Sequence, residues 1–184
     1  MASRSGLSFW AWIGEVFAKK YTVFQAMKFI KKIVLWGIAG LALLFILIQF
    51  IQPAHMNPAV KSDFLTATKA PENIAAMYRA ACYDCHSDET VWPWYSHVSP
   101  MSWQVVQDVN EGREALNLSE WPSISKSQWK RMENMSDAID SGFMPLKKYT
   151  LIHKDARLTA DQRKQLTDWL SEQVAALKSQ GGTN

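Results

Sequence analysis

The longest feature in the pattern of apolar and polar residues is a run near the N-terminus. Residues 33–51 read IVLWGIAGLALLFILIQFI, without a charged side chain and with Gln49 as the one clearly polar residue. As a helix, this run would extend about 28 Å at ~1.5 Å per residue, which is close to the hydrocarbon thickness of a bilayer. It therefore predicts a single transmembrane helix over residues 33–52.

The residues on either side of this run indicate how it would sit in the membrane. Residues 1–32 mix aromatic and aliphatic side chains with lysines, which is typical of an amphipathic helix at a membrane surface. Lys31 and Lys32 precede the run directly, so the positive-inside rule places the N-terminus in the cytoplasm. The length of the run, and the lack of a small-residue cleavage site after it, favour an uncleaved signal anchor over a cleaved signal peptide.

Beyond the membrane segment, the pattern predicts helices and no strand. Residues 53–70 contain two prolines and no clear periodicity, which predicts a linker. Residues 71–184 are then expected to form an all-α domain, because apolar residues recur every three or four positions. The expected helices cover residues 71–81, about 101–116, about 125–141 and about 159–180.

Two local signals mark helix ends in this domain. Gly142 follows the third expected helix and is a plausible residue to stop it. Thr159 and Gln162 have the spacing of a capping box, in which each side chain accepts a hydrogen bond from the backbone of the other residue.

The net charge of +3 is unevenly distributed along the chain. Residues 1–32 carry six basic side chains and one acidic one, whereas residues 53–184 carry fourteen basic and sixteen acidic ones. Because the positive charge lies beside the membrane segment and not on the globular part, a nucleic-acid-binding surface is not expected.

Residues 82–86, CYDCH, carry the clearest chemical signal. Cys-x-x-Cys-His is the attachment motif of c-type haem. Residues three apart on one helical turn face the same way, so Cys82 and Cys85 can bond the two haem vinyl groups. His86 then becomes the proximal ligand of the iron. The motif predicts one covalent haem, because the chain has no other cysteine.

Three other uses of a cysteine pair are less consistent with this sequence. A zinc site usually takes four Cys or His ligands, whereas His55, His97 and His153 are scattered along the chain. A thioredoxin-like pair follows a strand in a βαβ pattern, but the residues before the motif are predicted to be helical. A disulfide between residues three apart in a helix has poor geometry.

The motif and three further segments, NEGREALNLSEW, GFMP and LTADQRKQLTDWL, resemble the bacterial haem-binding domain family of cytochrome-c-like proteins. The resemblance extends over about residues 70–177 and implies a helical fold of the class I cytochrome c kind around one haem. It also points to Met144 as the distal iron ligand. The neighbouring residues are consistent with that role, since Pro145 stiffens the chain after Met144 and Gly142 allows a turn before it.

Several features of the haem environment stay open at this level. His97, Met101 and His153 are alternatives to Met144, and so is an open sixth position. The aromatic residues after the motif, Trp92, Trp94 and Tyr95, are expected either to fill the core or to donate hydrogen bonds to a haem propionate.

Together these features predict an electron-transfer protein. Haem iron with His and Met ligands favours reversible one-electron transfer. We expect a membrane-anchored monohaem c-type cytochrome of the inner membrane, single-pass, with its haem domain in the periplasm. It would serve a respiratory or photosynthetic membrane complex, as a subunit or as a carrier, and would not be an enzyme by itself.

The expected partners are the membrane and a larger membrane protein complex or redox protein, with no nucleic acid and no small-molecule substrate. A haem-based sensor with an exchangeable ligand is one alternative. A peroxidase with an open iron site and a positioned acid or base is another. His97 or His153 could supply that acid or base, but nothing in their spacing selects either, and ligation by Met144 argues against the sensor.

Overall fold

The computed structural model describes residues 5–121 and 126–181. Residues 1–4 of the expected amphipathic segment, residue 125 at the expected start of the third helix, and residues 182–184 lie outside the described part. Within it the chain is helical and contains no strand; a single β-bridge pairs Ser62 with Glu120. The prediction of an all-α fold with one apolar N-terminal helix is confirmed.

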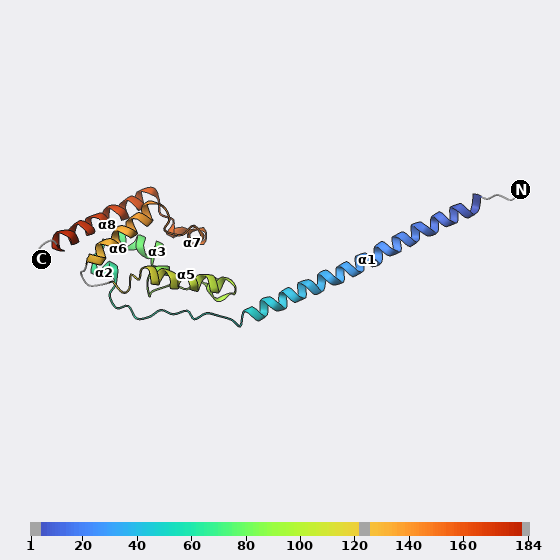
Figure 1. The fold of residues 1–184 in the computed structure, drawn as a ribbon, viewed down its shortest axis with the longest axis horizontal. Helices are drawn as coiled ribbons and strands as arrows, with labels where there is room; N and C mark the ends of the chain where they lie inside the picture. The colour runs from blue at the N-terminus through green and yellow to red at the C-terminus, as the bar shows by residue number, and fades with distance from the viewer. Residues whose placement is uncertain (1–4, 122–125, 182–184) are drawn as a thin grey trace. The chain divides into compact units, whose positions relative to one another are not determined.

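The chain divides into two units, Met1–Ile51 and Gln52–Asn184. The first unit is the helix α1 (Ser5–Ile48), which runs without a break through the boundary expected near residue 32 (Figure 1). Its portion Phe24–Ile48 is long and apolar enough to cross a membrane, and none of its most apolar stretch is buried. Trp36, for example, is 76% exposed. So large an apolar surface requires an apolar environment or a partner.

The second unit contains the remaining helices (Figure 1). In chain order they are α2 (Phe64–Ala67), α3 (Glu72–Ala81), α4 (Tyr83–His86), η1 (Trp94–His97), α5 (Met101–Ala115), α6 (Lys126–Asp140), α7 (Lys147–Ile152), η2 (Lys154–Ala156) and α8 (Ala160–Gly181).

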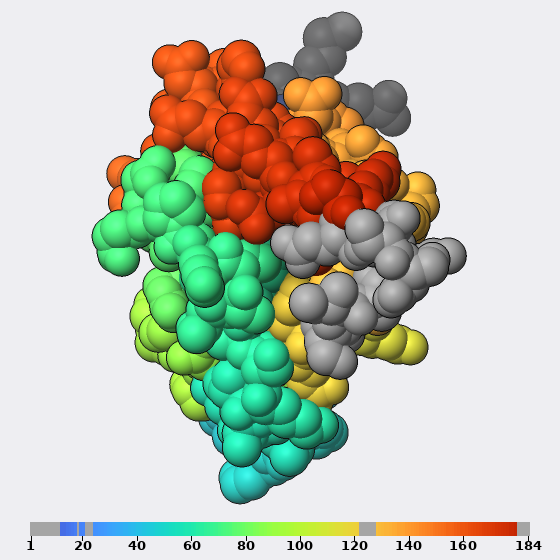
Figure 2. All heavy atoms as spheres, turned by 90° about the vertical axis from the view of Figure 1, so that its left-hand side faces the viewer, coloured from blue at the N-terminus to red at the C-terminus, as the bar shows by residue number. Residues whose placement is uncertain are grey.

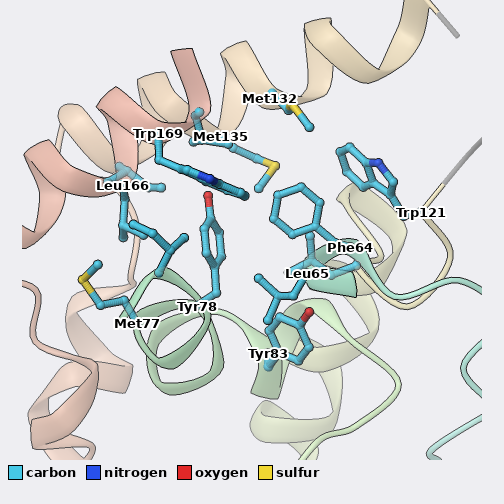
Figure 3. Close-up of a cluster of buried hydrophobic side chains, with 14 of the residues drawn as sticks. Phe64, Leu65, Met77, Tyr78, Tyr83, Trp121, Met132, Met135, Leu166 and Trp169 are labelled. Carbon is cyan, nitrogen blue, oxygen red and sulfur yellow. The ribbon is translucent and has the colours of Figure 1, made fainter. Parts of the chain in front are cut away.

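The core of this unit is an aromatic and aliphatic cluster between α2, α3, α6 and α8 (Figure 3). Phe64 is fully buried, and its ring centroid lies 5.4 Å from that of Tyr78, 4.6 Å from that of Trp121 and 5.7 Å from that of Trp169. Aromatic rings at these separations add to the free energy gained from burial. The core therefore ties the first short helix to the last long one.

Phe64 belongs to the segment expected to be a linker. The end of this segment is ordered because it forms the short helix α2. Asp63 caps α2 and accepts hydrogen bonds from the backbone N–H of Thr66 (2.8 Å) and from the hydroxyl of Tyr83 (2.6 Å). The segment before α3 (teal) and α8 (red) contribute to the same face of the unit in Figure 2. The end of the expected linker is thus part of the core.

The helix ends follow the local signals in the sequence. Thr159 and Gln162 form the capping box, with hydrogen bonds of 2.8 Å and 3.2 Å in the two directions. Gly142 has a φ of +71°, in the left-handed region that glycine adopts readily, and it follows the end of α6. The helix α7 was not predicted from the sequence.

Candidate functional site

The cysteine motif occupies the single helical turn α4. Cys82 stands at its N-cap, and its carbonyl accepts the backbone N–H of Cys85 (3.2 Å) and of His86 (2.9 Å). Both thiols are free and half-buried. Burial raises the pKa of Cys82 to about 12 and that of Cys85 to about 11. Cysteines that exchange disulfides need a lowered pKa, so this environment does not favour a thioredoxin-like pair.

Helix α5 packs directly on the motif at Gly112. A Cβ added to this buried glycine would overlap the carbonyl oxygen of Cys85 and lie 3.0 Å from its carbonyl carbon. The backbones of α4 and α5 can approach this closely only because residue 112 has no side chain.

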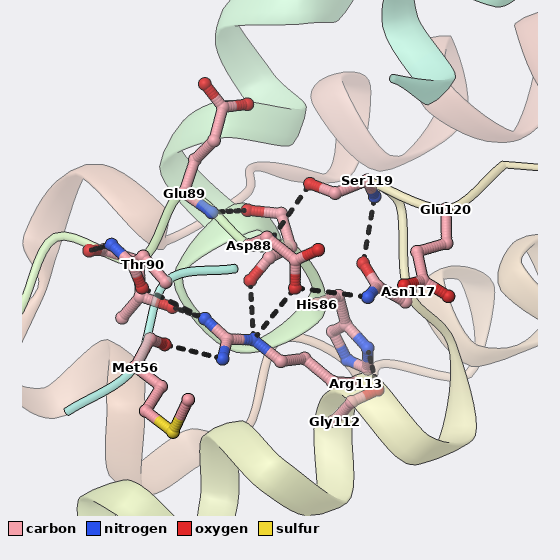
Figure 4. Close-up of polar contacts among 12 residues, drawn as sticks. Met56, His86, Asp88, Glu89, Thr90, Gly112, Arg113, Asn117, Ser119 and Glu120 are labelled. Atoms are coloured by element: carbon pink, nitrogen blue, oxygen red, sulfur yellow. Dashed lines mark hydrogen bonds and ion pairs between the residues drawn. The ribbon is translucent and has the colours of Figure 1, made fainter. Parts of the chain in front are cut away.

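This close approach sets the tautomer of His86. The Nδ1 of His86 lies 2.8 Å from the carbonyl oxygen of Gly112 and 3.1 Å from that of Leu116 (Figure 4). Both partners accept hydrogen bonds and cannot donate them, so Nδ1 must carry the proton. The lone pair is then on Nε2, which is the arrangement that metal-binding histidines usually have.

The segment after the motif is held in place by the guanidinium of Arg113 (Figure 4). It donates to the carbonyl of Ser87 (2.7 Å) and to the carbonyl of Met56 (2.7 Å). It also donates to the hydroxyl of Thr90 (2.9 Å) and lies 3.6 Å from the carboxylate of Asp88. These contacts fix the backbone on both sides of α4 relative to α5.

Two adjoining cavities bring the four predicted site residues together. The first cavity, of about 300 Å³, is lined by Cys82, His86 and Met144. The second cavity, of about 250 Å³, is lined by Cys85 and again by His86 and Met144. Apolar side chains common to both walls are Ala81, Ala115 and Phe143.

Met144 lies on the loop between α6 and α7, and this loop is fixed at two points. The backbone N–H of Met144 donates a hydrogen bond to the carbonyl of Ala138 (2.9 Å). The guanidinium of Arg163, on α8, donates to the carbonyls of Ile139 and Met144, both at 2.8 Å. Arg163 therefore joins the end of α6 to the loop that carries the methionine. Sequence reasoning missed this residue, which lies in the middle of a helix and has no distinguishing motif.

The other candidates for the sixth ligand lie elsewhere. His97 is exposed and its ring stacks near that of His55, with centroids 4.3 Å apart. Met101 and His153 line a third cavity, of about 150 Å³, which includes Cys85 but neither His86 nor Met144. There the Nε2 of His153 lies 2.6 Å from the hydroxyl of Tyr95.

The aromatic residues after the motif are also away from the two cavities that His86 lines. Trp94 is 78% exposed. The ring of Trp92 packs edge-on against His55, with centroids 4.6 Å apart, and Tyr95 lines the third cavity. None of the three belongs to the walls that Met144 shares with His86.

The residues of the two cavities fit a haem. The walls are largely apolar, as a porphyrin face requires, and Cys82 and Cys85 lie on them beside His86, whose Nδ1 and not Nε2 is engaged by backbone carbonyls. The hydroxyl of Tyr78, which lines the first cavity, is buried without a hydrogen-bond partner in the described part of the chain. Buried hydroxyls are nearly always paired, so a ligand with polar groups suits this cavity.

Fold and site therefore define a helical haem-binding protein. Residues 43–172 match the sequence profile of the haem-binding domain family, and the chain belongs to that family. It is also similar to the cytochrome c peroxidase Ccp of Escherichia coli (strain K12), with 21% identity over 159 residues that cover 81% of this chain. The chain spans about a third of the length of that protein, 34% of it. No solved structure matches.

Proposed function

We propose that this chain is a membrane-anchored c-type cytochrome with one covalent haem, and that it passes single electrons to or from a larger membrane complex. The observation that carries the proposal is the convergence of Cys82, Cys85, His86 and Met144 on two adjoining apolar cavities. When bound there, haem would supply reversible one-electron exchange between ferric and ferrous iron.

The two cysteines would attach the cofactor without any redox step. Cys82 and Cys85 would each hold the haem through a thioether bond to one of its vinyl groups, and the thiol hydrogen would go to the other carbon of that vinyl group. Cys82 and Cys85 are free in the structure, as this addition requires. Because a thioether cannot hydrolyse or exchange as a disulfide does, the attachment would be permanent.

His86 and Met144, which line both cavities, would hold the iron. His86 presents Nε2 because Nδ1 donates to backbone carbonyls, and Met144 presents a thioether from a loop fixed by Arg163. A methionine ligand raises the reduction potential and fills the sixth position. Both effects suit a carrier that exchanges electrons without binding a substrate at the iron.

The helix α1 supports a membrane anchor. Its uncharged part after Lys32 is preceded by Lys28, Lys31 and Lys32, inside the portion Phe24–Ile48 that could span a membrane, which favours a cytoplasmic N-terminus. The haem domain would then lie in the periplasm, beside the inner membrane. The portion of α1 before the apolar stretch is longer than an anchor needs, which supports docking to a membrane complex.

A peroxidase is a second candidate, because the chain is similar to a protein named cytochrome c peroxidase. A peroxidase needs an iron position open to hydrogen peroxide. The two functions therefore differ in whether Met144 occupies the sixth position.

The test uses the full chain purified in detergent. For a carrier, haem stays on the polypeptide after acid–acetone extraction. Near-infrared magnetic circular dichroism then shows His/Met ligation, and the ferrous protein does not bind carbon monoxide. Met144→Ala should open the iron to carbon monoxide and lower the potential, whereas Met101→Ala should behave like the wild type. Turnover of hydrogen peroxide by the wild type would favour the peroxidase. An unchanged spectrum in Met144→Ala would refute the ligand assignment.

A further inference from the structure

The charged and amide side chains of the two cavities that His86 lines are segregated. In the first cavity they are Arg131 and Asn134, both on α6. In the second cavity they are Asp108 and Glu111, both on α5. One end of the combined space is therefore cationic and the other acidic.

The face of α6 explains how Arg131 and Asn134 reach the first cavity. They are three residues apart and so lie on one side of the helix. The same face continues along α6 with Met135, Ala138 and Ile139, which also line the first cavity. Met135 and Ile139 are buried, whereas Arg131 and Asn134 are exposed. Helix α6 thus gives the cavity an apolar wall and a polar rim.

The guanidinium of Arg131 is also free to bind a ligand. Within the described residues it has no recorded hydrogen bond or ion pair, whereas its neighbour Lys130 lies 3.9 Å from the carboxylate of Glu133. At the acidic end, by contrast, both carboxylates have partners. The carboxylate of Asp108 pairs with the ammonium of Lys148 (2.6 Å), and that of Glu111 accepts a hydrogen bond from the amide of Gln107 (2.7 Å). An unpaired guanidinium beside an otherwise apolar cavity is suited to an anionic ligand group.

We propose that Arg131 and Asn134 bind the propionate carboxylates of the haem. This inference rests on the proposed haem site and adds its orientation. A guanidinium matches a carboxylate with two parallel hydrogen bonds, and the amide of Asn134 adds a neutral donor. Placed at the other end, the same carboxylates would meet Asp108 and Glu111 and be repelled. Helix α6 therefore holds the propionate edge. The sequence had offered Trp92, Trp94 and Tyr95 as candidates for that role, with core packing as the alternative.

The assignment predicts that the charge of Arg131 raises the midpoint potential of the haem iron, although Arg131 does not bind the iron itself. A positive charge near the haem favours the ferrous form, because oxidation adds positive charge to the iron. Removing that charge should lower the midpoint potential. A residue that only stabilised α6 would leave the potential unchanged while haem stayed attached.

The experiment compares full-length, haem-loaded variants in detergent. Arg131→Gln should shift the propionate bending bands in the resonance Raman spectrum and lower the midpoint potential, with covalent haem content unchanged. Lys130→Gln removes the same charge one residue away, off the cavity wall, and should leave the bands in place. Arg131→Lys should restore most of the potential, because it restores the charge. Asn134→Leu should shift the bands by less than Arg131→Gln.

The outcomes separate this inference from the proposed function. If Arg131→Gln and Lys130→Gln give the same bands and the same potential while both carry haem, the propionate assignment is wrong and the haem site stands. If the wild type binds no haem, both proposals fail, and that result is visible before any variant is made.

Discussion

Replacing Gly112 by alanine tests whether the close approach of α5 to the motif builds the side of the site that carries His86. The added methyl group would overlap the carbonyl oxygen of Cys85, so α5 must move away from α4. Overpacking of this kind costs about 1–3 kcal/mol. Movement also weakens the hydrogen bond from His86 to the carbonyl of residue 112, which contributes about 0.5–1.5 kcal/mol. Alanine regains about 1 kcal/mol through helix propensity.

The net destabilisation expected for Gly112→Ala is therefore about 1–3 kcal/mol, or a fall in Tm of about 5–10 °C for a unit of this size. Thermal unfolding of the full chain, followed by tryptophan fluorescence, measures it. Asn110→Ala is the matched control, because Asn110 is exposed on the same helix and alanine should stabilise it by a few tenths of a kcal/mol. If Gly112→Ala were as stable as Asn110→Ala, the packing argument would fail.

Two further predictions concern the distal loop and the cap of α2. Arg163→Ala removes the side-chain hydrogen bonds to the carbonyls of Ile139 and Met144, each worth about 1.5–3 kcal/mol for a charged donor, so the proposed ligation by Met144 should be lost at a lower temperature. Lys164→Ala, which breaks only an exposed ion pair, should not change it. Burial by itself raises the pKa of Asp63, but hydrogen bonds from Tyr83 and Thr66 outweigh it and lower this pKa. The carboxylate therefore stabilises the fold above its unfolded pKa of about 3.9, and the effect disappears as pH falls through the lower folded pKa. Asp63→Ala should cost about 1–2 kcal/mol at pH 7 and clearly less near pH 3, as measured by urea unfolding at both values; equal losses would contradict this sign.

The longer helices could be predicted because their signals are local, whereas the short helices α2 and α7 could not. The period of apolar residues depends only on neighbours three and four positions away, and the capping box of Thr159 and Gln162 lies within four residues. For the same reason the motif identified Cys82, Cys85 and His86 as a unit. Met144 required the resemblance to a family, because no local pattern separates it from the other methionines.

The features that could not be predicted depend on contacts between distant parts of the chain. Gly112 lowers helix propensity, so the local sequence argues against a helix at this position. Glycine is needed there because the backbone of Cys85, distant in the sequence, packs directly against it. Phe64 sits in a polar segment with prolines, yet it is buried by aromatic rings from α3 and α8. Arg131 resembles any surface cation until α6 is placed beside the cavity.

The two sides of the site are built in different ways, and this difference bears on function. The side that carries His86 consists of backbone contacts: α4 lies against α5, and His86 is held by two carbonyls. The side that carries Met144 is a loop held by the side chain of Arg163 and one backbone hydrogen bond. Backbone contacts in a packed core open only with large-scale unfolding, whereas a loop on few hydrogen bonds opens locally. Changes at the loop would therefore alter the proposed sixth ligand while the contacts of His86 stay intact. The two proposed functions, a carrier with Met144 on the iron and a peroxidase with an open iron position, would then differ by a local change at this loop and not by a different fold.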